Sequence, residues 1–175
     1  MKNKLFKTCQ SCGMPMKKDE DFGTESNGSL SKEYCTYCYQ NGKFTEPDIA
    51  IDTMAEKGGA IMSQMYDIPP EKAVEFAREQ LSYLKRWAGR EIKMCESCGM
   101  PLVNEEDIGT ETDGSKNSVY CIHCYRDGVF TEPGLTKDEA ADKYAPMMAE
   151  HLGMPVAKAR EMVMSYLSSL PRWQN

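Results

Sequence analysis

The chain has 175 residues and a net formal charge of −6, with 21 Lys and Arg against 27 Asp and Glu. This acidic balance argues against a general electrostatic attraction to nucleic acid. No apolar run approaches the ~20 residues of a membrane-spanning helix, and the opening residues, MKNKLFKT, do not fit an export signal. We therefore expect the protein to stay in the reducing cytoplasm.

The sequence consists of two copies of one unit, the second lying 86 positions after the first. Residues 9–38 read CQSCGMPMKKDEDFGTESNGSLSKEYCTYC, and residues 95–124 read CESCGMPLVNEEDIGTETDGSKNSVYCIHC. The correspondence continues without a gap to Trp87 and Trp173. A unit of this size is close to the lower limit for a stable hydrophobic core, so each copy is expected to need a staple.

Each copy contains two CxxC pairs separated by 22 residues. A short CxxC loop, or knuckle, aims two sulfurs at one point, and two knuckles supply four ligands for one tetrahedral zinc ion. No coordination position stays open, which is typical of a structural site rather than a catalytic one. The pattern predicts two zinc ions per chain. The predicted ligands are Cys9, Cys12, Cys35 and Cys38 in the first site, and Cys95, Cys98, Cys121 and Cys124 in the second.

The cysteine pattern has two other uses in proteins, a disulfide framework and an iron site. The even cysteine count permits a disulfide framework, but the repeated knuckles and the lack of an export signal argue against it. Iron is the closer competitor, because four thiolates hold either metal. His123 lies inside a knuckle, yet its site already has four cysteines and the first copy has Tyr37 there, so a surface role is expected.

A β-hairpin is expected between the two knuckles of each copy. Asn27-Gly28 in the first copy and Asp113-Gly114 in the second are strong hairpin signals. In the first copy, strands of about 22–26 and 29–35 should then carry Cys35 into place.

Glycines flank both knuckles. Gly13, repeated as Gly99, follows the first knuckle and is expected to have a positive φ. After the second knuckle, Gly42 is expected to end a short helical turn, from which Phe44 packs back on the ribbon.

These residues resemble a known family. The run CQSCGMPM, then FGT, NGS and YCTYCYQNGKFTEP, with a tail ending in LKRW, is similar to the zinc-ribbon family of small microbial four-cysteine proteins. The resemblance covers both halves, and the four cysteines of each copy fall on the family's metal ligands. It implies a zinc ribbon in each half and leaves the activity open, although some members are labelled transcriptional regulators.

Helical periodicity begins beyond Pro47 and Pro133. In the second copy, Thr136 and Glu139 form a capping box. Gly58-Gly59 and Pro146 interrupt the first helix of each copy, so a kink or a division into two pieces is expected. The apolar stripe of that helix comprises Ile51, Met54, Ala55, Gly58, Ile61, Met62, Met65 and Tyr66, with Lys137, Ala140, Ala141, Tyr144, Met147, Met148, His151 and Leu152 as equivalents.

A second helix should start near Pro69-Pro70 and Pro155, which suit a first helical turn. Its stripe is Ala73, Ala77, Leu81 and Leu84, repeated as Ala159, Val163, Leu167 and Leu170. His151 is expected to be packed rather than catalytic, and the 13 methionines to fill the helical core rather than bind copper.

The predicted fold class is α+β, with two tandem repeats, each a four-cysteine zinc ribbon followed by a helical hairpin. The helices of the two repeats are expected to pack together with pseudo-two-fold symmetry. Met62, Met65, Leu81 and Leu84 should lie near this joint, facing Met148, His151, Leu167 and Leu170. The expected boundaries are 1–48 for ribbon 1, 49–88 for hairpin 1, 89–134 for the linker and ribbon 2, and 135–175 for hairpin 2.

No catalytic constellation is recognisable, so the first hypothesis is a non-enzymatic zinc protein that binds an unidentified protein partner. A nucleic-acid-binding transcriptional regulator is the alternative, with the basic residues near Lys85 and Arg86 making the contacts despite the net charge. A third hypothesis is a redox sensor in which oxidised thiolates release zinc.

Overall fold

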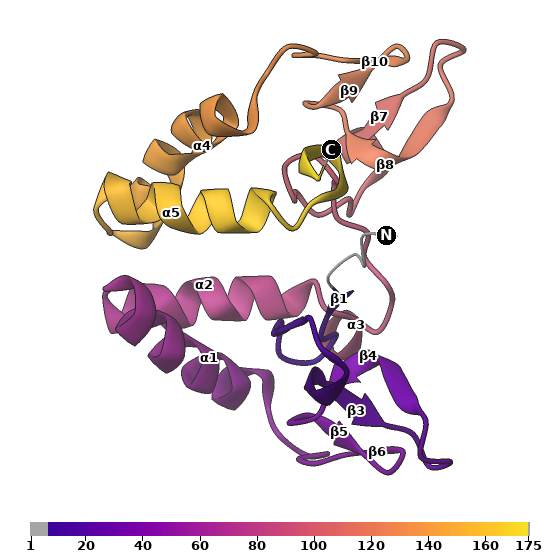
Figure 1. Cartoon of the computed structure of the whole chain (residues 1–175), viewed down its shortest axis with the longest axis vertical. Helices are drawn as coiled ribbons and strands as arrows, with labels where there is room; N and C mark the ends of the chain where they lie inside the picture. The colour runs from indigo at the N-terminus through magenta and orange to yellow at the C-terminus, as the bar shows by residue number, and fades with distance from the viewer. Residues whose placement is uncertain (1–6, 175) are drawn as a thin grey trace. The chain divides into compact units, whose positions relative to one another are not determined.

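A computed structural model describes residues 7–174, which form two compact units, residues 7–91 and residues 92–174. Each unit is a small β-ribbon followed by a pair of packed helices (Figure 1). The α+β class and the tandem repeat are therefore confirmed. The pairing of helices across the two repeats stays a prediction.

The ribbon of the first unit consists of three short antiparallel pairs. Strand β1 (Lys7–Thr8) pairs with β2 (Pro15–Met16), β3 (Phe22–Thr24) with β4 (Leu30–Cys35), and β5 (Tyr39–Gln40) with β6 (Lys43–Phe44). A 3-10 turn, η1 (Asp19–Asp21), precedes β3. The hairpin on Asn27-Gly28 is thus confirmed, with strands slightly shorter than expected.

The ribbon of the second unit repeats this plan. Its elements are η2 (Glu105–Asp107), β7 (Ile108–Thr110), β8 (Lys116–Cys121), β9 (Tyr125–Arg126) and β10 (Val129–Phe130). Strand β7 pairs with β8 and β9 with β10. A single bridge between Met94 and Pro101 replaces the β1–β2 pair.

The prediction of a helical turn at Gly42 is wrong. Asn41 and Gly42 have φ of 51° and 77° and form the tight turn between β5 and β6. Two successive positive φ values match the right-handed twist of a two-residue hairpin. Phe44 does pack back on the ribbon, with its ring centroid 5.0 Å from that of Tyr34 and 5.4 Å from that of Tyr39.

The helices of the first unit are α1 (Ile51–Tyr66), α2 (Pro70–Ser82) and the short α3 (Lys85–Ala88). Those of the second unit are α4 (Lys137–Leu152), α5 (Val156–Leu167) and the 3-10 turn η3 (Pro171–Trp173). The predicted starts at the prolines hold, and the Thr136–Glu139 capping box opens α4. Among the described residues, no helix is long and apolar enough to cross a lipid bilayer.

The first helix of each unit is continuous over 16 residues, so its expected division into two pieces is wrong. A β-carbon on Gly59 would lie only 2.7 Å from the Cα of Val74. The glycine therefore serves close packing of α1 on α2 rather than a break. In α4 the helix continues through Pro146 with one backbone donor fewer.

The second helices bury their predicted stripes. Leu81 and Leu84 pack in the core of the first unit, and Leu167 and Leu170 in that of the second. The stripe on the first helices is buried in part. Met54 shares a cluster with Cys9 and Met16 of the ribbon, and Leu152 at the end of α4 is fully buried.

Farther along the first helices, apolar side chains are exposed. The exposed fractions are 60% for Ile61, 65% for Met65 and 71% for Met147. His151 is also exposed, so the prediction of a packed histidine is wrong.

Candidate metal centres

The knuckles are built by local backbone hydrogen bonds. The Cys9 N–H donates to the Met14 carbonyl and the Gly13 N–H to the Cys9 carbonyl, both at 2.9 Å. Gly13 and Gly99 both have φ of +79°, as expected for the residue after the pair. In the second knuckle the Cys38 N–H donates to the Cys35 carbonyl at 3.0 Å.

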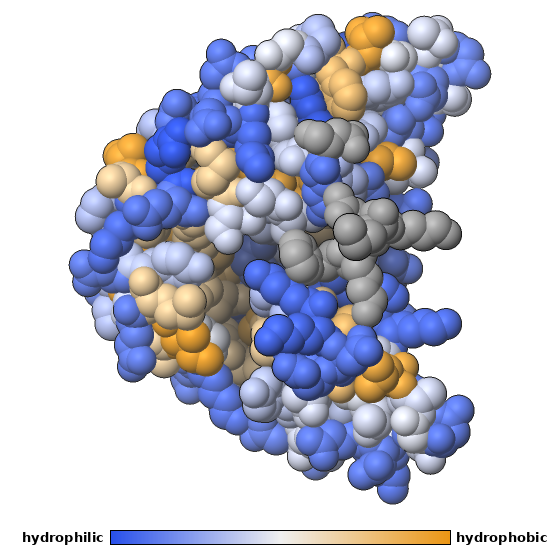
Figure 2. Space-filling model, viewed as in Figure 1, coloured by the Kyte–Doolittle hydropathy of each residue, from blue (hydrophilic) through white to orange (hydrophobic). Residues whose placement is uncertain are grey.

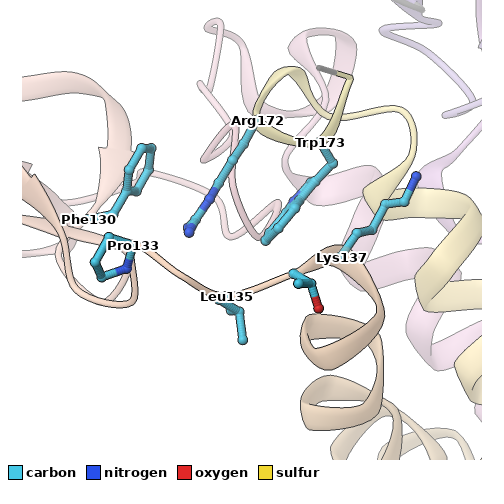
Figure 3. A pocket seen from close by; sticks show the side chains of 7 residues that line it. Phe130, Pro133, Leu135, Lys137, Arg172 and Trp173 are labelled. Atoms are coloured by element: carbon cyan, nitrogen blue, oxygen red, sulfur yellow. The ribbon is translucent and has the colours of Figure 1, made fainter.

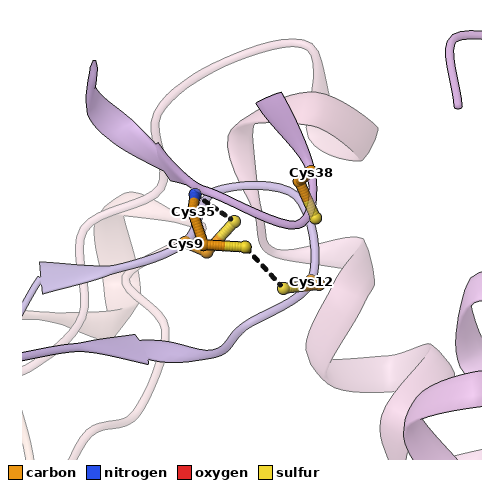
Figure 4. A group of neighbouring side chains, drawn as sticks. All are labelled: Cys9, Cys12, Cys35 and Cys38. Atoms are coloured by element: carbon orange, nitrogen blue, oxygen red, sulfur yellow. Dashed lines mark hydrogen bonds between the residues drawn. The ribbon is translucent and has the colours of Figure 1, made fainter. Parts of the chain in front are cut away.

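The structure brings all eight predicted ligands together in two groups of four. Within each group the four sulfurs lie within 4.8 Å of one another, and Figure 4 shows those of the first group converging. The Sγ atoms of Cys12 and Cys35 are 3.7 Å apart, as are those of Cys98 and Cys121. Metal–sulfur bonds of about 2.3 Å at tetrahedral angles separate sulfurs by about 3.8 Å.

This spacing fits a four-thiolate metal site. A disulfide would place two sulfurs about 2.05 Å apart, and all eight cysteines are free. Soft thiolate sulfurs arranged as a tetrahedron favour zinc or iron. A complete tetrahedron of protein ligands leaves no position for a substrate, so the arrangement is structural.

Three cysteines of each site are buried, and one sulfur of each site accepts a hydrogen bond from the backbone. The Cys35 N–H donates to Cys9 Sγ at 3.2 Å, and the Cys121 N–H donates to Cys95 Sγ at 3.3 Å. Hydrogen bonds from the neighbouring thiols and from these amides lower the pKa of Cys9 and Cys95. The thiolate, the form that binds metal, is therefore favoured at one cysteine of each site, whereas hydrogen bonds with Cys35 and Cys121 raise the pKa of Cys12 and Cys98.

Each site is tied to the end of its own helical hairpin. In the first unit, Arg86 Nη1 donates to Ser11 Oγ at 2.9 Å, and Trp87 Nε1 donates to the Ser11 carbonyl at 2.7 Å. Ser11 lies between the two cysteines of the first knuckle and is fully buried. Arg86 also donates to the Glu46 carbonyl at 2.7 Å and lies 4.0 Å from the centroid of the Phe44 ring. We call Ser11, Arg86 and Trp87 the first clasp.

The second unit repeats these contacts. Arg172 Nη1 donates to Ser97 Oγ at 2.8 Å, and Trp173 Nε1 donates to the Ser97 carbonyl at 2.7 Å. Ser97, Arg172 and Trp173 form the second clasp. The sequence analysis missed both clasps, although the repeated Arg-Trp pair and the repeated Ser inside CxSC were available as signals.

A groove of about 440 Å³ lies beside the second clasp (Figure 3). Its lining residues are Phe130, Pro133, Leu135, Thr136, Lys137, Arg172 and Trp173. Arg172 points between Phe130 and Trp173 and already donates to Ser97 and Glu132, while Thr136 serves the capping box. These lining residues contain no pair of a nucleophile and a base.

The histidine inside the knuckle lies at its surface. His123 is exposed, as is its counterpart Tyr37, whose exposed fraction is 75%. The carbonyl of each accepts a 2.7 Å hydrogen bond from a threonine hydroxyl, Thr131 and Thr45 respectively. The tips of the second knuckles thus present different side chains on the same backbone.

A family model described as "Putative zinc ribbon domain" matches the chain twice, at residues 8–88 and 94–174. Each match spans a complete unit, from the first knuckle to the Trp of the clasp. No curated protein and no solved structure matches the chain.

Proposed function

Because the chain belongs to the zinc ribbon family over both of its halves, we propose that it is a non-enzymatic protein that binds two zinc ions and serves as a binding or regulatory module for another protein. The proposal places it in the cytoplasm, where thiols stay reduced. The observation that carries it is the pair of closed four-sulfur sites, each clasped to a helical hairpin.

The metal's role in this proposal is to hold each ribbon in the shape that the clasp recognises. Ser11 and Ser97 sit inside CxxC loops whose conformation depends on the ligands around them. Structural zinc sites contribute folding free energy directly. Zinc therefore supports the position of the helices as well as that of the knuckles.

Exposed apolar side chains on the first helices support a protein partner. Ile61 and Met65 lie one helical turn apart on α1, and Met147 is exposed on α4. The face seen in Figure 2 is mostly hydrophilic, with a few separate hydrophobic patches. Apolar side chains grouped on a polar surface are typical of interaction sites.

The cations that the nucleic-acid alternative relies on already make contacts within the protein. Lys85 Nζ lies 2.6 Å from Glu33 Oε1, and Arg86 is held in the first clasp. Residues 1–87 carry 12 Lys and Arg against 13 Asp and Glu, whereas residues 88–175 carry 9 against 14. Neither half carries the net positive charge that favours phosphate contacts.

Affinity capture with the zinc-loaded chain tests the proposal. If a partner binds through α1, its capture should be saturable. The double variant Ile61→Gln and Met65→Gln should no longer capture it. Gln64→Ser, an exposed polar change on the same helix, should leave capture unchanged. A partner retained by the double variant would contradict the role of α1.

The enzymatic alternative is tested separately. A turnover reaction that one side-chain change abolishes, with both zinc ions still bound, would contradict the proposed function. Strongly salt-dependent binding to duplex DNA would favour the nucleic-acid alternative instead.

A further inference from the structure

The two metal sites differ in what covers the loop after the first knuckle. In the second unit, Tyr166 of α5 lies against Gly99. A β-carbon built on Gly99 would lie 2.2 Å from Cε1 and 2.3 Å from the hydroxyl oxygen of Tyr166. Gly99 is half-buried as a result.

The first unit lacks this cover. Gly13 is exposed, and the nearest atom that a β-carbon on it would meet is Leu84 Cδ1, at 3.9 Å. Gln80 occupies the position equivalent to Tyr166 and is exposed. The φ of the two glycines and the sulfur spacing of the two sites are the same, so the sites differ in cover rather than in coordination geometry.

The loop that Tyr166 covers in the second unit also carries the most exposed cysteine of that site. Three cysteines of each site are buried, whereas Cys12 and Cys98, which directly precede the glycines, are half-buried. An incoming ligand or a thiol reagent therefore reaches each site first at this cysteine. In the second unit the Tyr166 ring lies against Gly99, the residue that directly follows this cysteine.

We infer that the two sites exchange zinc at different rates, with the first site labile and the second retained. This inference rests on the proposed function, because it requires zinc in both sites. In the exchange step a chelator donor forms a bond to zinc as the Cys12 thiolate leaves, and solvent supplies the proton that the freed thiolate takes up. No oxidant or reductant is needed.

One contact found only in the first unit favours slower release of zinc from the first site. The Lys85–Glu33 ion pair joins α3 to β4, and the equivalent positions in the second unit are Pro171 and Val119. Both side chains of the pair are more than 40% exposed, and exposed ion pairs contribute little to stability. The pair borders Gln10 of the first knuckle, whose N–H donates to the Glu33 carbonyl at 2.8 Å and whose Oε1 accepts from the Lys85 N–H at 3.2 Å. Neither partner lies within 4 Å of a β-carbon built on the glycine that follows the first knuckle.

Transfer of zinc from the full chain to an excess of the chromophoric chelator 4-(2-pyridylazo)resorcinol tests the inference. Two equivalents should leave in two phases. The second should be slower by roughly tenfold, the lower end of the effect that residues around a metal site have on its affinity. Alkylation by iodoacetamide in the same time course, read by peptide mass spectrometry, should label Cys12 before Cys98.

The two units supply matched variants. Tyr166→Gln should bring the slow phase to the rate of the fast one, whereas Tyr166→Phe keeps the ring and should leave it slow. Gln80→Tyr introduces the cover in the first unit and should slow the fast phase.

Release of both equivalents at one rate, or labelling of Cys98 first, would overturn the inference. So would slow and fast phases that neither Tyr166→Gln nor Gln80→Tyr changes. Two bound zinc ions with equal release rates leave the proposed function intact, whereas a chain that binds no zinc contradicts the proposed function itself.

Discussion

The two units repeat the contacts of the clasp, whereas their helical hairpins share only part of their packing. The clasp repeats almost atom for atom, with 2.7 Å from each Trp Nε1 to the serine carbonyl. The helix interface repeats only in part, with Leu81 and Leu167 buried at equivalent positions. Gly59 at the crossing of α1 and α2 is replaced by the buried Ala145 in α4.

Interhelical ion pairs show the same contrast. Asp52 of α1 pairs with Arg78 of α2, while its equivalent Asp138 pairs with Arg160 of α5. Arg160 occupies the position of Val74, one turn earlier in the second helix than Arg78. The metal site and the clasp thus keep the same side chains in both units, whereas the hairpin tolerates different residues over part of its interface.

Loss of one ligand should have the largest effect. Cys35→Ser should remove the zinc of the first unit and unfold that unit, because structural zinc supplies folding free energy on the order of 10 kcal/mol. Cys121→Ser should do the same in the second unit. Hydrogen–deuterium exchange should show the loss of protection concentrated in the mutated unit, and equal loss in both units would contradict separate sites.

Substitution of the clasp arginine should have the next largest effect on stability. Arg86→Lys cannot donate to Ser11 Oγ and to the Glu46 carbonyl at once, and it loses the planar contact with Phe44. We expect a loss of about 2 kcal/mol in the free energy of unfolding. Urea unfolding followed by Trp87 fluorescence in a Trp173→Phe background measures this.

Arg172→Lys, followed by Trp173 in a Trp87→Phe background, is the matched variant in the second unit. If the repeat of the clasp reflects equal importance, the two losses should agree. A loss in one unit alone would show that the second clasp is not equivalent.

Substitutions at the helix crossing should lower the free energy of unfolding by less than the clasp variants do. Gly59→Ala forces a methyl group toward the Val74 backbone, and the cost of overpacking exceeds the gain in helix propensity, leaving a net loss of about 1 kcal/mol. Ala145→Gly loses a buried methyl group and helix propensity, again about 1 kcal/mol. Thermal unfolding of the two variants checks both signs, and stabilisation by Gly59→Ala would contradict the tight crossing.

Changes in helix capping should have the smallest effect on the free energy of unfolding. Thr136→Ala removes the N-cap of α4 and should cost about 1 kcal/mol. The first unit has Ala50 at this position, without a side-chain cap. Ala50→Thr should therefore stabilise the first unit by up to about 1 kcal/mol. Hydrogen–deuterium exchange checks both variants. The first-turn amides of α4 should exchange faster in Thr136→Ala, and those of α1 should exchange more slowly in Ala50→Thr.

Much of the site was predictable because it is local. The CxxC spacing specifies two sulfurs in one loop, and the Asn27-Gly28 turn brings the loops together. The stripe through Leu81 and the Thr136 capping box are also short-range patterns.

The clasps were not predictable in the same way. Arg86 and Ser11 are 75 residues apart in the chain, and no periodicity links a tail to a knuckle. The contact of Tyr166 with Gly99 likewise depends on tertiary packing. Ile61 and Met65 lie on the predicted stripe yet are exposed, because helical periodicity does not indicate how far along a helix its apolar face is covered.

The metal content of the chain purified without added zinc tests the central claim most directly. Elemental analysis with native mass spectrometry should find two zinc ions per chain in the wild type and one in each of Cys35→Ser and Cys121→Ser. A red, iron-containing protein, or a folded chain with no metal at all, would contradict the account.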